Sequence, residues 1–410
     1  MSGQERHQKA DILILWAYYG EGHRQASLAL AKALGEARPE LAVETLDYME
    51  AISPLFSRVT RLSYLETIKV APFLYGYYYR ATGYISTDSF LQQRLNRIGC
   101  GKILQVLQKL APRVVISTYP TSSGAISELK RAGLLDLPLV TVITDHAVHS
   151  QWIAPGTDLY LVASQRVRRG LIRRGVPAER IAVTGIPIDP KFNQGLDQGA
   201  MREKYGLRPD WPVVLVMSGA YGVLGGVPEI CRLLASFDQP VQALVVAGRD
   251  LRLRSRVEAI AARASVPMRV FGYVEEVEEL MAAADLLITK AGGLTTSEAL
   301  AMSLPMIIYR PIPGQEEENT RFLVHAGAAV RARNIKELSQ HLHRLLTDEG
   351  ARAEMKQRAR AAARPEAARE AARLILDLYG GRAEERDAAS SQLSLRSISR
   401  RREVESGGAR

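Results

Sequence analysis

Cysteine is nearly absent from this sequence, and its scarcity excludes two common kinds of stabilisation. The 410 residues include only Cys100 and Cys231, which lie far apart in the chain. A disulfide framework needs several pairs of cysteines, and a structural zinc site needs closely spaced ligands. The sequence therefore implies neither of them.

Long apolar stretches are absent as well. A helix that spans a bilayer needs roughly 18 or more consecutive apolar residues, and no such uncharged run occurs in the chain. The opening residues, MSGQERHQKA, are polar and do not resemble a secretory signal peptide. These absences predict a cytoplasmic protein.

Several motifs of nucleotide and metal chemistry are also missing. The chain contains neither the GxxxxGK[ST] phosphate loop nor the GxGxxG motif, which disfavours kinase and dinucleotide-dependent functions. It also contains no Asp-X-Asp triplet, a common metal-holding motif. We therefore expect no metal ion at the active site.

The overall composition is typical of a globular protein, since 47% of the residues are hydrophobic and 24% are charged. The length favours two or three domains, each large enough for its own core. The formal net charge of +10 indicates an anionic partner, either a membrane surface or nucleic acid.

The most informative stretch runs from Asp285 to Phe322. Its pattern predicts a short buried strand over residues 285–289, a Gly-Gly turn, a helix that begins near Thr295, and a second strand over residues 305–309. This strand–turn–helix–strand order is typical of a parallel α/β sheet, in which ligands bind beyond the carboxyl ends of the strands.

The turn at residues 290–293 (KAGG) carries the first group of candidate binding residues. Its small residues let a ligand approach the backbone. Thr295 and Thr296 then begin a helix whose free N–H groups favour a phosphate. Glu298, in the first turn of that helix, is placed to reach a ribose diol. The alternative is an ordinary helix with a capping residue and no ligand.

Two further polar segments follow predicted strands. Residues 313–316 (PGQE) come one strand after the Gly-Gly turn, and residues 218–226 (SGAYGVLGG) follow a predicted strand over residues 212–217. The glycine-rich loop suits a diphosphate. Because the carboxyl ends of parallel strands share one edge of the sheet, we expect these segments to form a nucleotide-sugar site.

The first half of the chain offers a candidate base. Residues 11–17 (DILILWA) predict a buried parallel strand, YYGEGH at 18–23 a turn, and residues 24–34 a helix. His23 therefore lies at a helix N-terminus, which disfavours the imidazolium and keeps the ring able to accept a proton. A structural or solvated histidine is the alternative.

Asp145 and His149 follow another predicted strand, over residues 138–144, in the segment TDHAVHSQW. His146 and His149 have a spacing that suits a metal pair, but neither a cysteine cluster nor a set of carboxylates accompanies them. We therefore expect Asp145 and His149 to act on the acceptor side, next to His23.

Residues 52–110 interrupt the α/β pattern with tyrosines and basic residues. Such a mixture suits a lipid–water interface, where rings lie at headgroup depth and cations face anionic lipid. It also suits stacking on single-stranded nucleic acid, or the packing of a helical insertion against its domain. The prominent side chains are Phe56, Arg58, Arg61, Tyr64, Lys69, Phe73, Tyr75, Tyr77, Tyr78, Tyr79, Arg80, Tyr84, Arg94, Arg97 and Lys102.

Three segments together resemble one enzyme family. They are YYGEGH at 18–23, TDHAVHSQW at 144–152 and TKAGGLTTSEALAMSLPMIIYRPIPGQEEEN at 289–319. In this order they resemble the monogalactosyldiacylglycerol synthases and diacylglycerol glucosyltransferases. That family is related to the N-acetylglucosaminyltransferase that completes the lipid-linked peptidoglycan precursor. The resemblance covers residues 10–380.

The resemblance implies a GT-B fold, in which two doubly wound, Rossmann-like α/β domains face each other across a cleft. Residues 1–186 would form an N-terminal domain that binds the acceptor and the membrane, and residues 187–364 would bind the UDP-sugar. Residues 365–380 would form a helix that returns to the N-terminal domain. Residues 381–410, rich in Arg, Ser and Glu, predict a disordered tail.

The resemblance also implies an inverting, metal-independent transfer of a hexose from a UDP-sugar, a co-substrate rather than a cofactor, to a lipid, with diacylglycerol favoured. His23 would be the general base, and Asp145 and His149 further catalytic candidates. The protein would act peripherally on the inner face of the plasma membrane. The donor would be held by Ser218, Gly219, Phe271, Tyr273, Lys290, Gly292, Gly293, Thr295, Thr296, Glu298, Gln315, Glu316 and Asn319.

Other functions remain open from the sequence. A UDP-N-acetylglucosamine transferase that acts on a polyprenyl-linked acceptor, or a UDP-sugar epimerase, would use the same donor site, although an epimerase has no need for the aromatic stretch. A nucleic-acid-binding protein would account for the charge and the tyrosines but not for the glycine loops or Glu298. We therefore expect no nucleic-acid partner.

Overall fold

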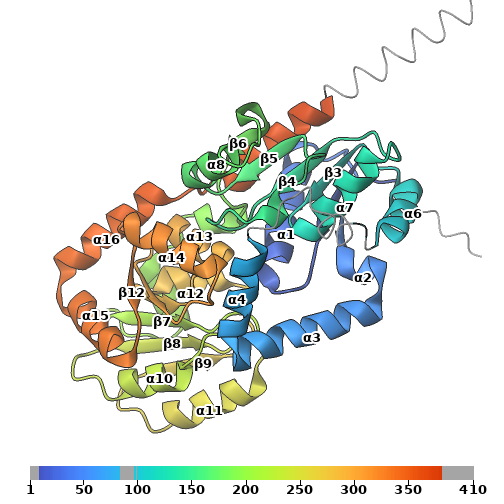
Figure 1. The fold of residues 1–410 in the computed structure, drawn as a ribbon. Coiled ribbons are helices and arrows are strands. Elements are labelled where there is room, and N and C mark those ends of the chain that lie inside the picture. The colour runs from blue at the N-terminus through green and yellow to red at the C-terminus, as the bar shows by residue number, and fades with distance from the viewer. Residues whose placement is uncertain (1–8, 84–96, 98, 381–410) are drawn as a thin grey trace, which may run out of the picture.

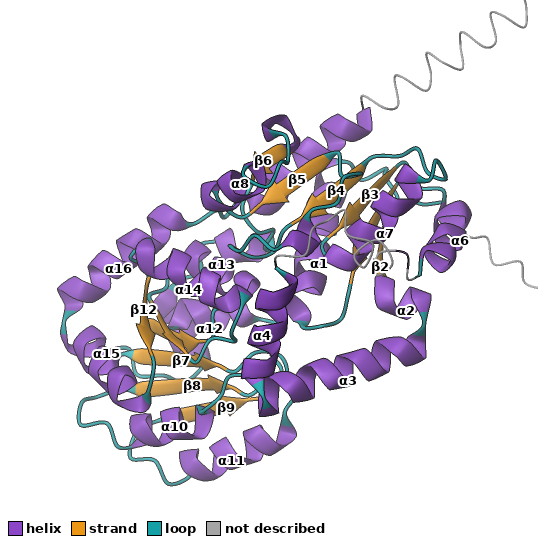
Figure 2. Cartoon of the chain, viewed as in Figure 1, coloured by secondary structure: helices purple, strands orange, loops and turns teal. Residues whose placement is uncertain are grey.

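The structure, a computed structural model, describes residues 9–83, 97 and 99–380 (Figure 1). The predicted disordered tail at residues 381–410 lies outside the described residues, as do Tyr84 and Arg94 of the aromatic stretch. The described chain forms two parallel six-stranded sheets flanked by helices (Figure 2). The prediction of two doubly wound α/β units is confirmed.

The first sheet has the strand order β2-β1-β3-β4-β5-β6. Its strand β1 reads ILILW and is almost wholly buried, as expected for a parallel strand with both faces covered. The strands are β1 (Ile12–Trp16), β2 (Val43–Asp47), β3 (Val114–Ser117), β4 (Leu139–Val142), β5 (Leu159–Val162) and β6 (Ile181–Val183). The helices are α1 (Glu21–Ala37), α2 (Tyr48–Ile52), α3 (Pro54–Val70), α4 (Pro72–Thr82), α6 (Cys100–Leu110), α7 (Pro120–Arg131) and α8 (Gln165–Ile172).

The second sheet has the strand order β12-β11-β10-β7-β8-β9. Its strands are β7 (Val213–Met217), β8 (Gln242–Val246), β9 (Met268–Phe271), β10 (Leu286–Thr289), β11 (Met306–Tyr309) and β12 (Ala329–Ala332). The helices are α9 (Gln198–Lys204), α10 (Val227–Ala235), α11 (Leu251–Ala261), α12 (Val277–Ala283), α13 (Gly293–Ala301), α14 (Gln315–His325), α15 (Ile335–Thr347) and α16 (Glu349–Ala362). Short 3-10 turns occur at η1 (Ser150–Trp152), η2 (Ala178–Arg180) and η3 (Pro190–Asn193).

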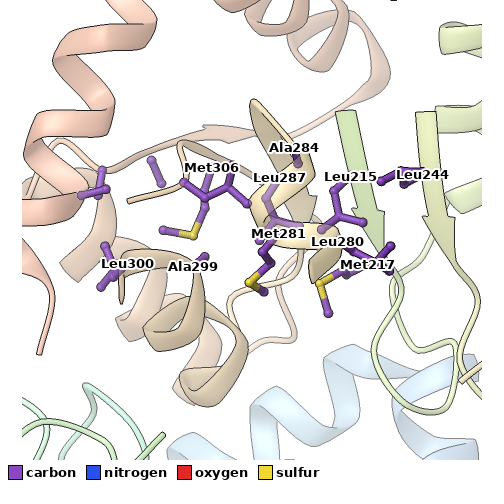
Figure 3. Packing of buried hydrophobic residues seen from close by; sticks show 14 of the residues in the cluster. Leu215, Met217, Leu244, Leu280, Met281, Ala284, Leu287, Ala299, Leu300 and Met306 are labelled. Atoms are coloured by element: carbon purple, nitrogen blue, oxygen red, sulfur yellow. The ribbon is translucent and has the colours of Figure 1, made fainter. Parts of the chain in front are cut away.

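The central strands of the second sheet are buried on both faces, which explains why β7 and β11 are continuous apolar runs. Leu215 of β7 and Leu287 of β10 pack in one cluster with Leu280 of α12 (Figure 3). Successive strand residues point to opposite faces, so Val214 and Val216 belong to a separate cluster that includes α10 and α15. The core therefore holds the strand ends in fixed relative positions.

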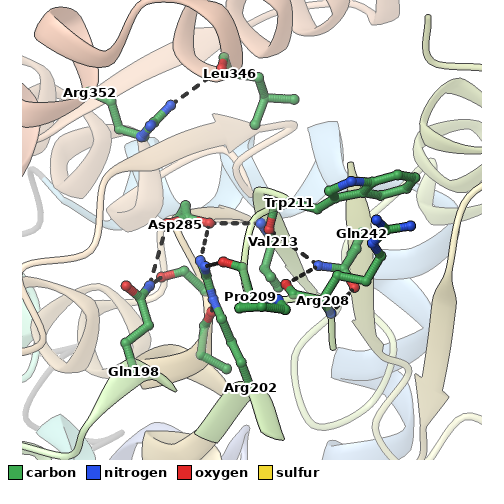
Figure 4. Close-up of polar contacts among 12 residues, drawn as sticks. Gln198, Arg202, Arg208, Pro209, Trp211, Val213, Gln242, Asp285, Leu346 and Arg352 are labelled. Atoms are coloured by element: carbon green, nitrogen blue, oxygen red, sulfur yellow. Dashed lines mark hydrogen bonds and ion pairs between the residues drawn. The ribbon is translucent and has the colours of Figure 1, made fainter. Parts of the chain in front are cut away.

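A polar network fixes the amino end of the second sheet (Figure 4). Asp285 lies just before β10 rather than within it, and its carboxylate accepts hydrogen bonds from Val213 N at 2.7 Å and Arg202 Nη2 at 2.6 Å. Gln242 accepts from Arg208 N at 2.7 Å. These contacts lie at the end of the sheet opposite the predicted site, so they stabilise the fold rather than bind a ligand.

The last described helix, residues 367–380, returns to the first sheet. Ala371 and Ile375 pack in the same cluster as Ile14 of β1. The hydroxyl of Tyr379 donates to Asp11 Oδ1 at 3.2 Å. The last described helix thus completes the hydrophobic core of the first sheet.

Helices α3 and α4 extend from the first half of the molecule to the second (Figure 1). Lys69 of α3 forms a 2.8 Å ion pair with Asp250, the residue before α11. In α4, Gly76 lies against Pro313, so close that an added Cβ would be 2.5 Å from the proline Cβ. Among the described residues, no helix combines the length and apolarity needed to span a membrane.

Candidate active site between the two sheets

A cavity of about 190 Å³ lies where the carboxyl ends of both sheets meet. His23, in the first turn of α1, and Asp145, which follows β4, line it from the first half of the chain. Lys290 and Gln315, which follow β10 and β11, line it from the second half, together with Gly219 after β7. The structure therefore brings together predicted residues that are widely separated in sequence, at the position where open α/β sheets bind ligands.

Gly293 allows the two halves to approach each other at this cavity. A Cβ added at Gly293 would lie 2.1 Å from Thr144 O, so no larger residue fits without separating the halves. Helix α13 begins here, two residues before the predicted start at Thr295. Its N-cap, Gly292, provides no side-chain hydrogen bond, so the free N–H groups at the helix start remain available to an anion in the cavity.

His23 is held by contacts from its own half. Its Nδ1 lies 3.2 Å from Thr144 Oγ1, and its ring packs edge-on against Tyr119 and near Trp152. Burial lowers the pKa of His23 to about 4, so the ring is neutral at physiological pH and able to accept a proton. Burial, rather than the helix N-terminus expected from the sequence, is the main cause of this neutrality.

Asp145 shares the cavity with His23, and opposing interactions determine the pKa of its carboxyl group. Burial raises the pKa of Asp145 to about 7, and the nearby Glu316 carboxylate acts in the same direction. A hydrogen bond from Asn319 and the charge of Lys290 oppose this rise by favouring the carboxylate. Both protonation states are therefore accessible near neutral pH.

Asn319 lies in α14 and joins the two halves instead of facing the cavity. Its Nδ2 donates to Asp145 Oδ1 at 2.8 Å and to Ala291 O at 2.9 Å, and its Oδ1 accepts from His146 N at 2.7 Å. The residue is fully buried. Its amide group is thus already engaged, and it positions Asp145 against the second half.

The second half contributes an ion pair to the same cavity. Lys290 Nζ lies 2.5 Å from Glu316 Oε1, and Glu316 Oε2 accepts from Ile312 N at 2.9 Å. Gln315 Oε1 accepts a hydrogen bond from the Tyr75 hydroxyl at 3.1 Å. The lysine is therefore fixed beside the start of α13, where it adds positive charge next to the free N–H groups.

A larger cavity of about 490 Å³ adjoins the first and shares Glu21, Gly219 and Thr295 with it. Tyr273 and Glu298 also line this cavity. Its size suits a nucleotide, and its walls combine helix α1, the turn η3 and the beginning of α13 with the loops that follow β7, β8 and β9.

Glu298 is the predicted ribose ligand, and it faces this larger cavity. It lies in the second turn of α13 rather than the first, because the helix begins at Gly293. Burial raises the pKa of Glu298 to about 8, partly opposed by the charge of Lys191. The charge of Lys191 is thus insufficient to keep the Glu298 carboxyl group ionised at neutral pH. Hydrogen-bond donors of a ligand would stabilise its ionised form.

Three predicted donor residues support the loops through their side chains. Ser218 Oγ donates to Val246 O at 2.8 Å, and Thr296 Oγ1 donates to Gly292 O at 2.8 Å. Phe271 packs edge-on against Tyr205, with ring centroids 5.9 Å apart. None of these three side chains lines either cavity in the described structure.

The structure does not place His149 with His23 and Asp145. His149 Nδ1 accepts from Gln151 N at 3.2 Å, and Nε2 donates to Tyr79 O at 2.9 Å. Nε2 thus holds the end of α4, and Nδ1 caps the short turn η1. Its geometry indicates a structural role.

Some residues of the site were not predicted. Arg249 Nη1 lies 2.5 Å from Glu21 Oε1, which joins the two halves across the larger cavity, and its guanidinium lies 3.7 Å from the centre of the Tyr273 ring. Tyr64 of α3 lines the smaller cavity. Arg249 follows β8, so it could have been predicted, as Lys290 was, from its position after the carboxyl end of a parallel strand. Nothing in the sequence distinguishes Tyr64 from its exposed neighbours.

Within the described residues, no group of three or more histidine, cysteine, aspartate and glutamate side chains is arranged to hold a metal ion. The positive groups at the cavity are Lys290 and the start of α13.

Comparison with known proteins gives consistent results for both halves. Residues 23–188 match the monogalactosyldiacylglycerol (MGDG) synthase family, and residues 197–362 match the glycosyl transferases group 1 family. The chain is 35% identical over 360 residues to a processive diacylglycerol beta-glucosyltransferase of Bacillus mycoides (strain KBAB4), covering 87% of this chain and 91% of that protein. It is 34% identical over 345 residues to the enzyme of that name from Bacillus subtilis (strain 168), covering 82% of this chain and 87% of that protein.

Solved structures show the same architecture at low sequence identity. MurG of Acinetobacter baumannii has a TM-score of 0.62 at 17% identity, covering 90% of this chain and 100% of MurG. HepE of Anabaena, in complex with UDP and glucose, has a TM-score of 0.55 at 16% identity, covering 90% and 99%. A UDP-N-acetylglucosamine 2-epimerase has a TM-score of 0.59 at 15% identity, covering 91% and 97%. These likenesses confirm the predicted GT-B arrangement of the two sheets.

Proposed function

Because the chain belongs to the family of monogalactosyldiacylglycerol synthases and processive diacylglycerol glucosyltransferases, we propose that it transfers a hexose from a UDP-sugar to diacylglycerol. The observation that carries this proposal is the pair of adjoining cavities. The larger has the size and polar lining for UDP, and the smaller contains His23 opposite Lys290 and the start of α13. A base and an anion-stabilising group therefore face the same space.

The proposed reaction is a single displacement with inversion. The acceptor hydroxyl oxygen forms a bond to the anomeric carbon, while the bond from that carbon to the β-phosphate oxygen breaks and UDP leaves. His23 takes the hydroxyl proton, which its depressed pKa permits at neutral pH. Proton transfer converts His23 to an imidazolium. When the carboxyl group of Asp145, in the same cavity, is ionised, its negative charge stabilises this imidazolium.

The leaving diphosphate gains negative charge, and the proposed enzyme stabilises it without a metal ion. The positive groups closest to the smaller cavity include the free N–H groups at the start of α13 and the ammonium of Lys290, which is paired with Glu316. The glycine-rich loop that contains Gly219 follows β7 on the same edge of the sheet. The lack of an Asp-X-Asp triplet in the sequence supports this assignment.

The activity test uses the purified protein with UDP-glucose and dioleoylglycerol in detergent micelles that contain EDTA. UDP release and a glucosyldiacylglycerol of β configuration, read by mass spectrometry and proton NMR, are the expected results. Parallel reactions with UDP-galactose and UDP-N-acetylglucosamine identify the sugar. No glycolipid from any of these donors would contradict the proposal.

The same assay separates the transferase from an epimerase of similar fold. A transferase leaves the UDP-sugar unchanged when no acceptor is present, whereas an epimerase converts it. Polyprenyl phosphate-linked acceptors, tested in place of diacylglycerol, distinguish the other transferase alternative.

We also propose that helices α3 and α4 contact a membrane surface at its cytoplasmic face. They carry large apolar side chains that are between 45% and 77% exposed. Monomeric proteins seldom expose so much contiguous apolar area without a partner. This α3–α4 apolar surface consists of Leu55, Phe56, Val59, Leu62, Val70, Phe73, Leu74, Tyr77 and Tyr78.

Some residues of the aromatic stretch do not belong to this surface. Tyr79 packs against His149, with ring centroids 4.4 Å apart, and Lys69 pairs with Asp250. Arg61 lies over the Tyr18 ring at 5.1 Å. These side chains join α3 and α4 to the rest of the molecule, as expected for a helical insertion that packs against its domain along part of its surface.

Replacing Phe73 and Tyr77 by serine should reduce sedimentation with phosphatidylglycerol-containing vesicles by about tenfold or more, since each side chain loses on the order of 1.5–3 kcal/mol of apolar burial. Both are highly exposed, so folding should survive. The matched control replaces Leu134 and Leu251, which are equally exposed on other elements. Equal binding by the two double variants would contradict a role for this surface.

A further inference from the structure

A third cavity, of about 430 Å³, is lined in part by residues 146–149, directly after Asp145 in the chain. None of its lining residues lines either cavity of the candidate active site. It is formed by the end of α4, the loop after β4, helix α8 and one residue of α14. The lining residues are Tyr79, Arg80, Gly83, His146, Ala147, Val148, His149, Arg166, Gly170, Arg173, Arg174 and Glu318.

The charge of this lining is strongly one-sided. Four arginines face a single acidic residue, Glu318. Glu318 pairs with Arg166 and is shared with Arg321 on its own helix. Arg80, Arg173 and Arg174 form no ion pair with any carboxylate among the described residues. The cavity, which we call the arginine cavity, therefore holds several cations that no carboxylate of the described residues compensates.

The floor of the arginine cavity offers a hydrogen-bonding group as well. His146 is 5% exposed and stacks on Phe322, with ring centroids 3.6 Å apart. Its Nδ1 is buried and has no hydrogen-bond partner in the described structure. Burial lowers the pKa of His146 to about 3, so the ring is neutral and adds polarity without charge. A buried polar atom without a partner is uncommon in proteins and points to a ligand.

We propose that the arginine cavity binds a phosphate group. Guanidinium groups present paired N–H donors that match the oxygens of a phosphate, and several of them around one space bind a doubly charged anion better than a carboxylate. The volume exceeds that of a phosphate alone, so a phosphate with an attached group fits. This proposal is independent of the activity proposed above.

Two sources of such a phosphate exist, namely an anionic phospholipid and the free anion. Helix α4 favours the lipid, because Arg80 in the cavity and Tyr77 on the α3–α4 apolar surface are three residues apart and so neighbours on one helix face. A phospholipid whose phosphate binds Arg80 would have its acyl chains beside exposed apolar side chains.

The experiment is calorimetric titration of the whole protein with three soluble probes, used below the concentration at which they form micelles. The probes are dihexanoyl phosphatidic acid, inorganic phosphate and dihexanoylglycerol, which lacks the phosphate. Binding of phosphatidic acid at least tenfold tighter than inorganic phosphate identifies the lipid, and equal affinities identify the free anion. Dihexanoylglycerol belongs to the proposed acceptor class, so any binding of it should be unchanged by R173Q combined with R174Q. No binding of either phosphate probe, or an equal loss of dihexanoylglycerol binding in that variant, overturns the proposal.

The matched variants locate the site. R173Q combined with R174Q should weaken binding of the phosphate probe by about tenfold or more, because charge-assisted hydrogen bonds are lost. R168Q combined with R169Q removes the same charge from helix α8, which Arg173 and Arg174 directly follow, but outside the cavity, and should change affinity less than twofold. Equal losses in both double variants would show only a general charge effect and overturn the site.

Folding and the donor site provide the internal checks. Arg173 and Arg174 are exposed, so the thermal unfolding midpoint without ligand should be unchanged. UDP-glucose affinity should be the same in all variants, because the cavities share no residue. R80Q tests the same site from α4 and should also weaken phosphate binding, and an unaltered affinity in R80Q would contradict the arrangement.

Discussion

Replacement of His23 by glutamine should lower the rate of sugar transfer about 100- to 10,000-fold, the usual cost of removing a general base. His23 is the candidate base in the cavity that also contains Lys290 and the start of α13. Glutamine is similar in size, so the packing against Tyr119 and Trp152 should be largely kept. The measurement is single-turnover transfer at saturating donor.

Donor binding should survive this change. The larger cavity is lined mostly from the second half of the chain, and His23 is not among its lining residues. UDP-glucose affinity measured by calorimetry should therefore stay within about twofold of the original. The matched control is H149Q, which should retain turnover within a few-fold, because His149 lines a different cavity. If H149Q lost activity as severely as H23Q, the assignment of His23 as the base would not stand.

Replacement of Glu298 by glutamine should weaken UDP-glucose binding by about 30- to 150-fold at pH 9, since hydrogen bonds to a charged carboxylate contribute on the order of 2–3 kcal/mol. The reason is that two ribose hydroxyls would donate to the ionised carboxylate. Titration calorimetry of both proteins with UDP-glucose measures the difference.

The pH dependence of UDP-glucose affinity tests this prediction most directly. Burial raises the pKa of Glu298 to about 8, so the carboxyl is mostly protonated in the free protein below that pH. Ribose binding favours the ionised form, so the affinity should rise as the pH increases from 6 and level off above about 8, with release of a proton. Glu298→Gln should remove this dependence. UDP-glucose is used instead of UDP because UDP has a terminal phosphate that titrates in the same pH range and would obscure the titration of Glu298.

A control carboxylate lies in the same cavity. Glu275 lines it but is exposed, so Glu275→Gln should leave both the affinity and its pH dependence unchanged. A flat pH profile in the original protein, or the same loss in both variants, would show that Glu298 does not contact the ribose.

The strands that carry the site were predictable because they are buried on both faces. Strands β1, β7 and β10 are continuous apolar runs with a polar turn after each. Edge strands β2 and β12 were not predicted, since VETLD and AVRA are short and mixed in polarity. One side of an edge strand is open, so its residues need not be apolar.

Contacts between the halves were beyond prediction from local pattern. The sequence places Asn319 among donor residues, yet its amide bonds Asp145, which lies 174 positions earlier in the chain. Similarly, Tyr77 is exposed and Tyr79 is not, because α4 turns one face towards His149. Such differences depend on how the two sheets pack against each other, and the spacing of apolar residues within one segment carries no information about that packing.

The returning helix at residues 367–380 has a consequence for biosynthesis. Its Ala371 and Ile375 cover apolar side chains of β1, including Ile14, near the beginning of the chain. During translation, part of the core of the first sheet must therefore stay uncovered until residues 367–380 have left the ribosome. We expect a nascent chain stalled before residue 366 to be a strong client of chaperones that recognise exposed apolar surface, and one stalled well past residue 380 to be released from them.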